Sequence, residues 1–320
     1  QANRSANQLV YIVSAISVAL MVLVLLFSRA LLGVLFGQVE PPVMEGAITY
    51  FVISALSYPF IAVYNGCAAL LRSMGNSRAS MYVSALMNGL NVVGNAILVF
   101  GFSMGVAGVA LATLVSRGVA CGIMMVLMHS RRNPVRVAQL LRFRLDGRLI
   151  GKILRIGVPN GLENSVFQLG RVLLVSMIST FGTAQIAANA VANTTSTFLN
   201  IPANAVSMAV LTVVGQCLGA GEKEQAVWYA RRLLLVAYCG AWVMNLSGFF
   251  FADRWALSWF NLSPEASAMA LEVMMWFNIV SLFFWPSSFT LPNILRSAGD
   301  ASFTMTVSIV SMWVFRVGFC

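Results

Sequence analysis

Long apolar runs alternate with short polar connections along the whole chain. A membrane-spanning helix needs about 20 mostly apolar residues, and nine stretches of this sequence are predicted to meet that need. The predicted spans are 9–36, 44–70, 79–100, 106–129, 153–180, 184–217, 227–252, 265–294 and 301–320. No alternation of apolar and polar residues with a period of two competes with these runs, so the pattern predicts a helical bundle and not a β-barrel.

The composition points to the same class of protein. Hydrophobic residues make up 59% of the 320 residues, and charged residues only 9%, whereas about 25% of a soluble domain is charged. Such a chain has too few polar side chains to cover a water-exposed surface. We therefore expect an all-α integral membrane protein, a polytopic bundle with about nine transmembrane helices in this chain, and we exclude soluble enzymes.

The basic residues predict the orientation in the membrane. If the nine spans alternate in direction, most of the 20 Lys and Arg residues fall on the side of residue 1, whereas Arg29 and Arg254 fall on the other. Positive loops face the cytoplasm. We therefore predict a multi-pass protein of the plasma (cytoplasmic) membrane, with residue 1 and segment 131–152 in the cytoplasm.

Segment 131–152 is a basic connector with interleaved apolar residues, and it divides the chain. We expect it to lie along the inner surface of the lipid bilayer and do not expect nucleic acid as a partner. It separates an incomplete N-terminal lobe of four helices, 1–130, from an incomplete C-terminal lobe of five helices, 153–320.

An internal repeat relates the two lobes. A shift of 224 residues places Leu71-Arg72-Ser73-Met74-Gly75-Asn76 on Leu295-Arg296-Ser297-Ala298-Gly299-Asp300. The shift covers six predicted spans, an even number, so both copies have the same orientation, and parallel repeats of this kind are typical of transporters. We expect two pseudo-symmetric six-helix lobes in the full protein, with two helices before residue 1 and one after residue 320.

Polar side chains recur at helical spacing inside four of the predicted spans. Interhelical hydrogen bonds, worth about 0.6 kcal/mol per contact, explain any single stripe. Four stripes rich in Asn fit better with a shared water-filled cavity. We predict that a substrate cavity is lined by Asn88, Asn160, Gln168, Asn189, Asn193, Asn200, Asn278 and Trp285.

Glu163 is the one acid placed well inside a predicted span. A charged side chain at the bilayer centre costs about 2.5–3.5 kcal/mol on insertion scales, so it is by default a functional candidate. Its carboxyl group can exchange a proton, or bind Na⁺ together with a neighbouring amide such as that of Asn164. The alternative is a structural ion pair with Arg171, Arg117 or Arg316. Arg171 lies about 12 Å further along the same helix, which is too far for direct pairing.

Prolines inside spans mark places where a helix can bend, because each removes a helix hydrogen bond. We predict hinges at Pro159, Pro202 and Pro286, the first of them one turn before Glu163.

Cysteine and histidine give no sign of a resident metal or of catalysis. The five cysteines are not in CxxC spacing and His129 is the sole histidine. We expect no catalytic residue, no metal-ligand cluster and no cofactor.

Several stretches together resemble the multidrug and toxic compound extrusion (MATE) transporters. They occur in family order and are residues 71–76, 91–101, 105–113, 157–163, 214–221 and 293–300. The resemblance implies twelve helices in two six-helix lobes. It also implies secondary active multidrug efflux, in which organic cations or drugs are exchanged for Na⁺ or H⁺ by alternating access. The expected partners are small-molecule cationic substrates and the lipid bilayer, and we expect a monomer.

By this resemblance, Glu163 corresponds to the coupling-ion carboxylate of the C-terminal lobe, and Asn91 and Asn95 correspond to its N-terminal-lobe cation site. Many family members have Asp at the position of Asn95, and some have an Asp near Phe284, where none occurs here. The C-terminal site built on Glu163 is therefore the favoured coupling site, with Na⁺ or H⁺ as the coupling ion.

Two other functions stay open. One is a lipid-linked oligosaccharide flippase of the same superfamily, which Arg117, Arg171 and Arg316 favour because a pyrophosphate needs cationic side chains. The other is a membrane-embedded enzyme or receptor, for which the sequence offers no paired carboxylates and no nucleophile with a base.

Overall fold

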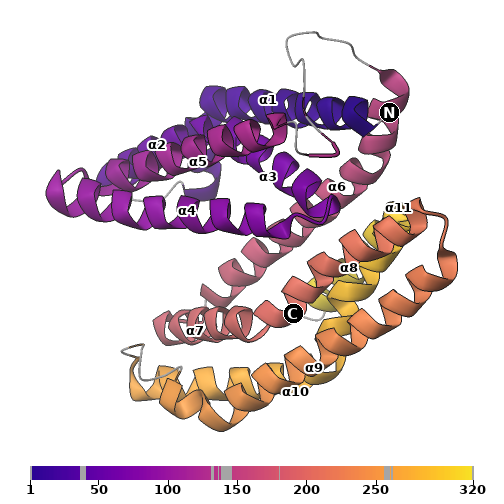
Figure 1. The fold of residues 1–320 in the computed structure, drawn as a ribbon. Helices are drawn as coiled ribbons and strands as arrows, with labels where there is room; N and C mark the ends of the chain where they lie inside the picture. The colour runs from indigo at the N-terminus through magenta and orange to yellow at the C-terminus, as the bar shows by residue number, and fades with distance from the viewer. Residues whose placement is uncertain are drawn as a thin grey trace. The chain divides into compact units, whose positions relative to one another are not determined.

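The computed structural model describes residues 2–36, 41–130, 133–135, 137, 146–179, 181–255, 260 and 262–318. Within them the regular secondary structure is helical throughout, and no strand occurs (Figure 1). The helices are α1 (Ala2–Phe36), α2 (Pro41–Leu56), α3 (Tyr58–Ser73), α4 (Ser77–Ala96), η1 (Ile97–Gly101), α5 (Gly105–His129), α6 (Gly147–Ser179), α7 (Thr183–Leu199), α8 (Ile201–Gly219), α9 (Lys223–Trp255), α10 (Pro264–Ser297), α11 (Ala301–Ser311) and η2 (Met312–Val317).

The predicted fold class is confirmed. Six helices of the described chain are long and apolar enough to cross a membrane, namely α1, α4 with η1, α5, α8, α9 and α10. The pair α2 and α3 passes the same test as a seventh span, bent by 43°. The predicted spans 153–180 and 301–320 are helical as α6 and α11 but are not among these seven, so the count of nine stays a prediction.

The predicted single span 184–217 is wrong, because the chain forms two helices there. α7 ends at Leu199 and α8 begins at Ile201, so Asn200 stands at the break. Pro202 lies in the first turn of α8, where a residue without an N–H group is tolerated because that turn has no earlier carbonyl to bond. The polar stripe of this region is therefore shared between two helices.

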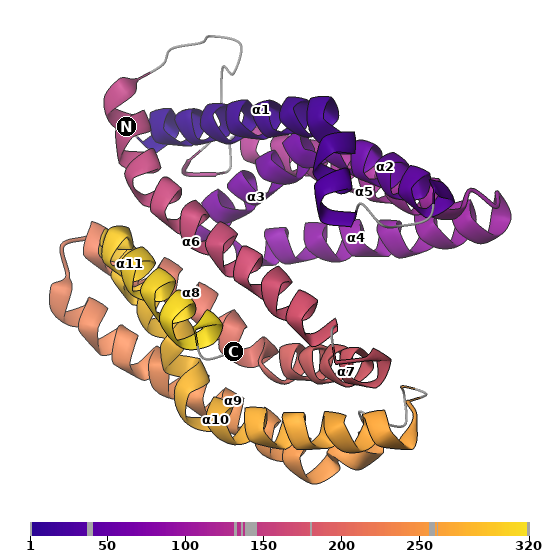
Figure 2. The same ribbon diagram turned by 180° about the vertical axis from the view of Figure 1, so that it is seen from behind.

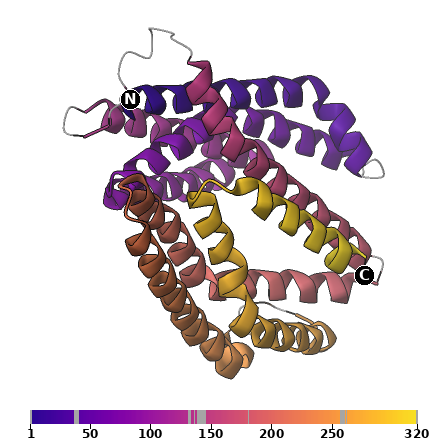
Figure 3. The ribbon, with the colours of Figure 1, turned by 90° about the vertical axis from the view of Figure 1, so that its right-hand side faces the viewer.

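The three predicted hinge prolines occupy different positions in their helices. Pro159 lies inside α6, Pro202 in the first turn of α8, and Pro286 inside α10, which also contains Pro292. α10 bends visibly along its length before it leads into α11 (Figure 3). That any of these prolines acts as a hinge stays a prediction.

The chain divides into two compact units, Gln1–Ile153 and Leu154–Cys320, which we call the N-terminal and C-terminal units. The division falls inside α6, near its start. Much of the predicted connector 131–152 lies outside the described residues, and α6 begins within it at Gly147.

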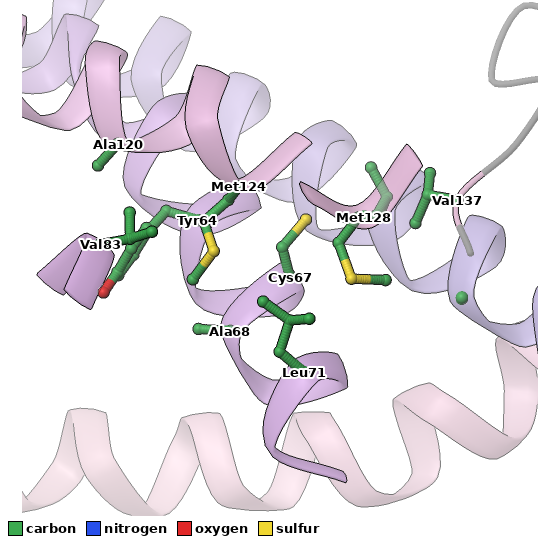
Figure 4. Packing of buried hydrophobic residues seen from close by; sticks show 11 residues of the cluster. Tyr64, Cys67, Ala68, Leu71, Val83, Ala120, Met124, Met128 and Val137 are labelled. Atoms are coloured by element: carbon green, nitrogen blue, oxygen red, sulfur yellow. The ribbon is translucent and has the colours of Figure 1, made fainter. Parts of the chain in front are cut away.

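The core of the N-terminal unit lies where α3 packs against α1 and α5. Its members are Ala6, Val10, Tyr64, Cys67, Ala68, Leu71, Val83, Ala120, Met124, Met128 and Val137, and Figure 4 shows most of them close together. Cys67 and Met124 are fully buried, as expected when a cysteine serves as a small hydrophobic residue.

In the C-terminal unit, α8, α9 and α10 pack against one another, and α7 packs on α10 (Figure 2). α7 buries one face, which includes Ala188, Ala192 and Ser196, and Ala192 packs against Met274 of α10. The opposite face of α7 is left for other contacts.

The internal repeat is visible in the backbone of one turn in each unit. Gly75 and Gly299 have φ of 80° and 92°, a conformation that favours glycine. Each glycine N–H donates to the carbonyl oxygen of the arginine three residues earlier, Arg72 or Arg296, at 2.9 and 3.0 Å. The next residue then caps the following helix: Asn76 Oδ1 accepts from Ala79 N at 3.3 Å, and Asp300 Oδ1 accepts from Phe303 N at 3.2 Å. The equivalent motifs therefore build the same helix end and helix start.

Candidate functional site

Glu163 lies in a polar cluster formed by three helices of the C-terminal unit. Its Oε2 accepts a hydrogen bond from Arg296 Nη2 of α10 at 2.6 Å, and its Oε1 accepts one from Ser308 Oγ of α11 at 2.8 Å. The exposed fractions of the side chains are 12% for Glu163 and 18% for Arg296. Both oxygens of the carboxylate thus have donors, and its charge is compensated within the protein.

The cluster continues from Arg296 into a fourth helix. Arg296 Nη1 donates to Asn293 Oδ1 at 2.9 Å, and Asn293 Nδ2 donates to Ser207 Oγ of α8 at 2.7 Å. Arg296 Nε is buried without a hydrogen-bond partner among the described residues. A buried donor without an acceptor costs free energy. The guanidinium of Arg296 therefore keeps an unsatisfied donor at Nε.

The ion-pair partner of Glu163 is Arg296 and not one of the three arginines predicted from the sequence. Arg171 lines a pocket further along α6, Arg117 Nη1 donates to Ser57 Oγ at 2.6 Å in the N-terminal unit, and the side chain of Arg316 lies outside the described part. Arg296 lies just beyond the predicted span 265–294, in the last turn of α10, and its long side chain reaches Glu163.

Among the described residues, no hydrogen bond joins the other predicted site residues of α6 to this carboxylate. Asn164 Nδ2 donates to the carbonyl oxygen of Asn160 at 2.8 Å and to its Oδ1 at 3.3 Å, one turn earlier. Gln168 and Asn164 are exposed. Asn164 is thus next to Glu163 in the sequence, but its side-chain amide donates to Asn160.

A second polar cluster lies between α4 and α5 in the N-terminal unit. Asn91 Nδ2 donates to Thr113 Oγ1 at 3.1 Å, and Asn95 Nδ2 donates to Asn91 Oδ1 at 3.2 Å. Asn95 Oδ1 is buried, with no hydrogen-bond partner among the described residues. The helices approach closely here, since a Cβ on Gly94 would lie 3.1 Å from Ala112 Cβ. The result is a group of neutral oxygen and nitrogen atoms.

A pocket of about 550 Å³ lies between α6 and α7. One face of α6 contributes Arg171, Leu174, Val175 and Ile178, and one face of α7 contributes Ile186, Asn189, Ala190, Asn193, Thr194 and Thr197. The two helices diverge from the turn that joins them (Figures 1 and 2). The pocket thus brings together Asn189 and Asn193 of the predicted cavity.

The remaining predicted cavity residues lie elsewhere. Asn88 is exposed on α4, whereas Asn200 and Asn278 are buried in the C-terminal unit. Asn200 Oδ1 accepts from Ser281 Oγ of α10 at 3.2 Å, which ties the α7–α8 break to α10. Trp285 of α10 stacks near Phe289, with ring centroids 4.2 Å apart. The predicted cavity residues are thus spread over four helices and the α7–α8 break.

Comparison with known proteins places the chain in a family. The MatE family model matches residues 1–97 and 159–320. The chain therefore belongs to the MatE family, the MATE transporters that its sequence motifs resemble.

Individual relatives are similar along most of the chain. The chain is 25% identical over 278 residues to the probable multidrug resistance protein YpnP of Bacillus subtilis, covering 85% of this chain and 60% of that protein. It is 25% identical over 293 residues to the probable multidrug resistance protein NorM of Thermotoga maritima, covering 88% and 61%. The chain thus spans about three fifths of the length of these curated relatives.

A solved structure supports the fold. The outward-facing conformation of a multidrug resistance MATE family transporter of the MOP superfamily matches with a TM-score of 0.88 at 20% identity. The match covers 99% of this chain and 70% of that chain. The described helices therefore have the fold of that structure.

Proposed function

We propose that the full-length protein carrying this chain is a multidrug efflux transporter of the plasma membrane that exchanges small molecules for Na⁺ or H⁺. Membership of a transporter family and the names of the relatives support efflux of small molecules by a multi-pass membrane protein. We further propose that it acts as a monomer, with residue 1 and segment 131–152 in the cytoplasm. The flippase alternative stays a prediction, with no relative cited above that favours it.

The Glu163 cluster carries the proposal for antiport. A carboxylate in a membrane helix is expected to have a partner of opposite charge, and Arg296 supplies one within the chain. A coupling ion that binds Glu163 replaces this partner, because a proton or Na⁺ takes up the same negative charge. Glu163 thus has two states, one paired with Arg296 and one occupied by the ion, and an ion that binds one state better shifts the balance between them.

The N-terminal cluster supports a narrower role. Asn91, Asn95 and Thr113 offer amide and hydroxyl oxygens, which can ligate Na⁺ but do not take up a proton near neutral pH. Of the two clusters, only that of Glu163 has a group that can bind either Na⁺ or H⁺. We therefore propose Glu163 as the coupling residue and Asn91 with Asn95 as an accessory oxygen site.

Prolines near the ion pair supply a route from ion binding to movement. Glu163 lies one turn after Pro159 in α6, and its partner Arg296 is one turn after Pro292 in α10. We propose that exchange of the partner of Glu163 changes the bending of α6 and α10, which opens the substrate path to alternate sides of the membrane.

Transport into everted vesicles tests this function. Vesicles containing the full-length protein are given an imposed Na⁺ or H⁺ gradient, and uptake is followed for cationic ethidium and for anionic carboxyfluorescein. We expect gradient-driven uptake of at least one dye, and we expect Glu163→Gln to abolish it. Glu272→Gln, an exposed acid on α10, is the matched control and should transport as the wild type does. Uptake that ignores both gradients, or that survives Glu163→Gln, would contradict the proposal.

A further inference from the structure

The pocket between α6 and α7 is lined by charge of one sign, which is positive. Among the ten described residues that line it, Arg171 is the one charged group and none is acidic. The nearest acid along α6 is Glu163, about 12 Å away along the helix axis, and that carboxylate is already paired with Arg296. An organic cation entering this pocket would meet a guanidinium and no compensating carboxylate.

Arg171 has no polar partner among the residues that the structure describes. It is exposed, and the described residues give it no hydrogen bond or ion pair. α6 covers the predicted span 153–180, and an unpaired charged side chain in a membrane-spanning helix is unfavourable and marks a substrate or ion path. Arginine is also the side chain best suited to anionic groups, because its planar guanidinium presents several donors. The missing partner is therefore expected to be negative.

The rest of the lining suits an amphiphile. Leu174, Val175, Ile178 and Ile186 form the apolar part of the wall. The hydroxyl groups of Thr194 and Thr197 donate to carbonyl oxygens of their own helix at 2.8 Å, and Asn193 Nδ2 donates to Asn189. These groups thus donate within α7, which leaves the Arg171 guanidinium as the one charged donor of the described lining, beside the side-chain amide of Asn189.

We propose that this pocket binds an amphiphilic organic anion, whose negative group pairs with Arg171 and whose apolar body lies along α6 and α7. The pocket volume of about 550 Å³ is in the range of sites for drug-sized ligands. The inference rests on the proposed transport function and refines its substrate class, since the sequence resemblance had led us to expect organic cations. The shared chemistry fits both a free amphiphilic anion and an anionic lipid headgroup.

Two ions of matched shape and opposite charge provide the test. Binding of tetraphenylborate and of tetraphenylphosphonium to the detergent-solubilised full-length protein is measured by equilibrium dialysis against detergent-matched blanks. We expect the wild type to bind the anion at least about tenfold more tightly. Arg171→Gln should remove this preference, and Arg171→Lys should keep part of it.

Further variants show where binding occurs. Arg155→Gln, which removes an exposed arginine of the same helix outside the pocket, should bind both ions as the wild type does. Thr194→Leu, which fills the pocket without a change in charge, should weaken binding of tetraphenylborate. Tighter binding of tetraphenylphosphonium by the wild type, or an anion affinity unchanged in both Arg171→Gln and Thr194→Leu, would overturn the proposal.

Competition by phosphatidylglycerol distinguishes the two sources of the anion. Displacement of tetraphenylborate in the wild type supports the pocket with a lipid headgroup as its ligand, and failure to displace it supports the pocket with a free amphiphilic anion. These binding measurements need no ion gradient. Absence of an anion preference would therefore contradict the pocket proposal alone, whereas absence of gradient-driven transport would contradict the proposed function.

Discussion

Glu163 of α6 and Arg296 of α10 form an ion pair with 2.6 Å between Oε2 and Nη2, although 133 residues separate them in the sequence. Ser308 donates to the other carboxylate oxygen, so three helices of the C-terminal unit meet at one acidic group. The same contact stabilises the unit and provides the carboxylate that we propose for ion coupling. The contribution of this ion pair to stability and the role of Glu163 in ion coupling can be measured separately.

The ion pair predicts non-additive effects on stability. Glu163→Gln and Arg296→Gln should each lower the midpoint of thermal unfolding in detergent, because each leaves a mostly buried charged group without its partner. The double variant should lose less than the sum of the two, with a coupling energy of about 2 kcal/mol. Additive losses would show that the two side chains do not interact in the folded protein.

Close packing between α4 and α5 predicts a steric effect at Gly94. A Cβ there would lie 3.1 Å from Ala112 Cβ, so Gly94→Leu should force the helices apart and cost about 1–3 kcal/mol. Gly118 of α5 has open space around its Cβ position, which makes Gly118→Leu the matched control. Equal thermal stability of the two variants would contradict the close approach.

The break between α7 and α8 predicts a specific role for Asn200. Its amide is fully buried, donates to Ser196 O at 2.8 Å and accepts from Ser281 Oγ. Asn200→Ala removes both bonds and leaves the Ser281 hydroxyl unmatched, so we expect a loss of about 1–2 kcal/mol. Asn204→Ala, which changes an exposed amide one turn later, should have little effect in the same thermal assay. If Asn204→Ala lowered thermal stability as much as Asn200→Ala, the proposed role of Asn200 at the break would be contradicted.

Much of the fold could be predicted from the sequence because membrane helices leave a strong signal. Apolar length located the helices, and the repeated Leu-Arg-Ser-x-Gly motif located the same turn at Gly75 and Gly299. The break at Asn200 was missed because the residues on both sides are apolar enough to continue one run. A proline two residues later, at Pro202, was the available signal, and it was interpreted as a hinge instead of a helix start.

The candidate site was predicted less completely. Glu163 was identified by the cost of a charge in a membrane helix, and Asn91 and Asn95 by a family motif. The partner Arg296 was missed because it lies two residues beyond the predicted span 265–294 and the reach of its long side chain was not considered. Its signal lay in the repeat, which placed this arginine inside the motif that ends α10. Ser308 had no signal, because a serine in an apolar helix is common.

We propose that the coupling cation competes with Arg296 for Glu163. The most direct test measures the concentration of the driving cation, Na⁺ or H⁺, that gives half-maximal gradient-driven transport by the full-length protein. Removal of the competitor in Arg296→Gln should lower this concentration about tenfold, and Glu163→Gln should show no dependence on the cation. An unchanged or higher concentration in Arg296→Gln would contradict the account.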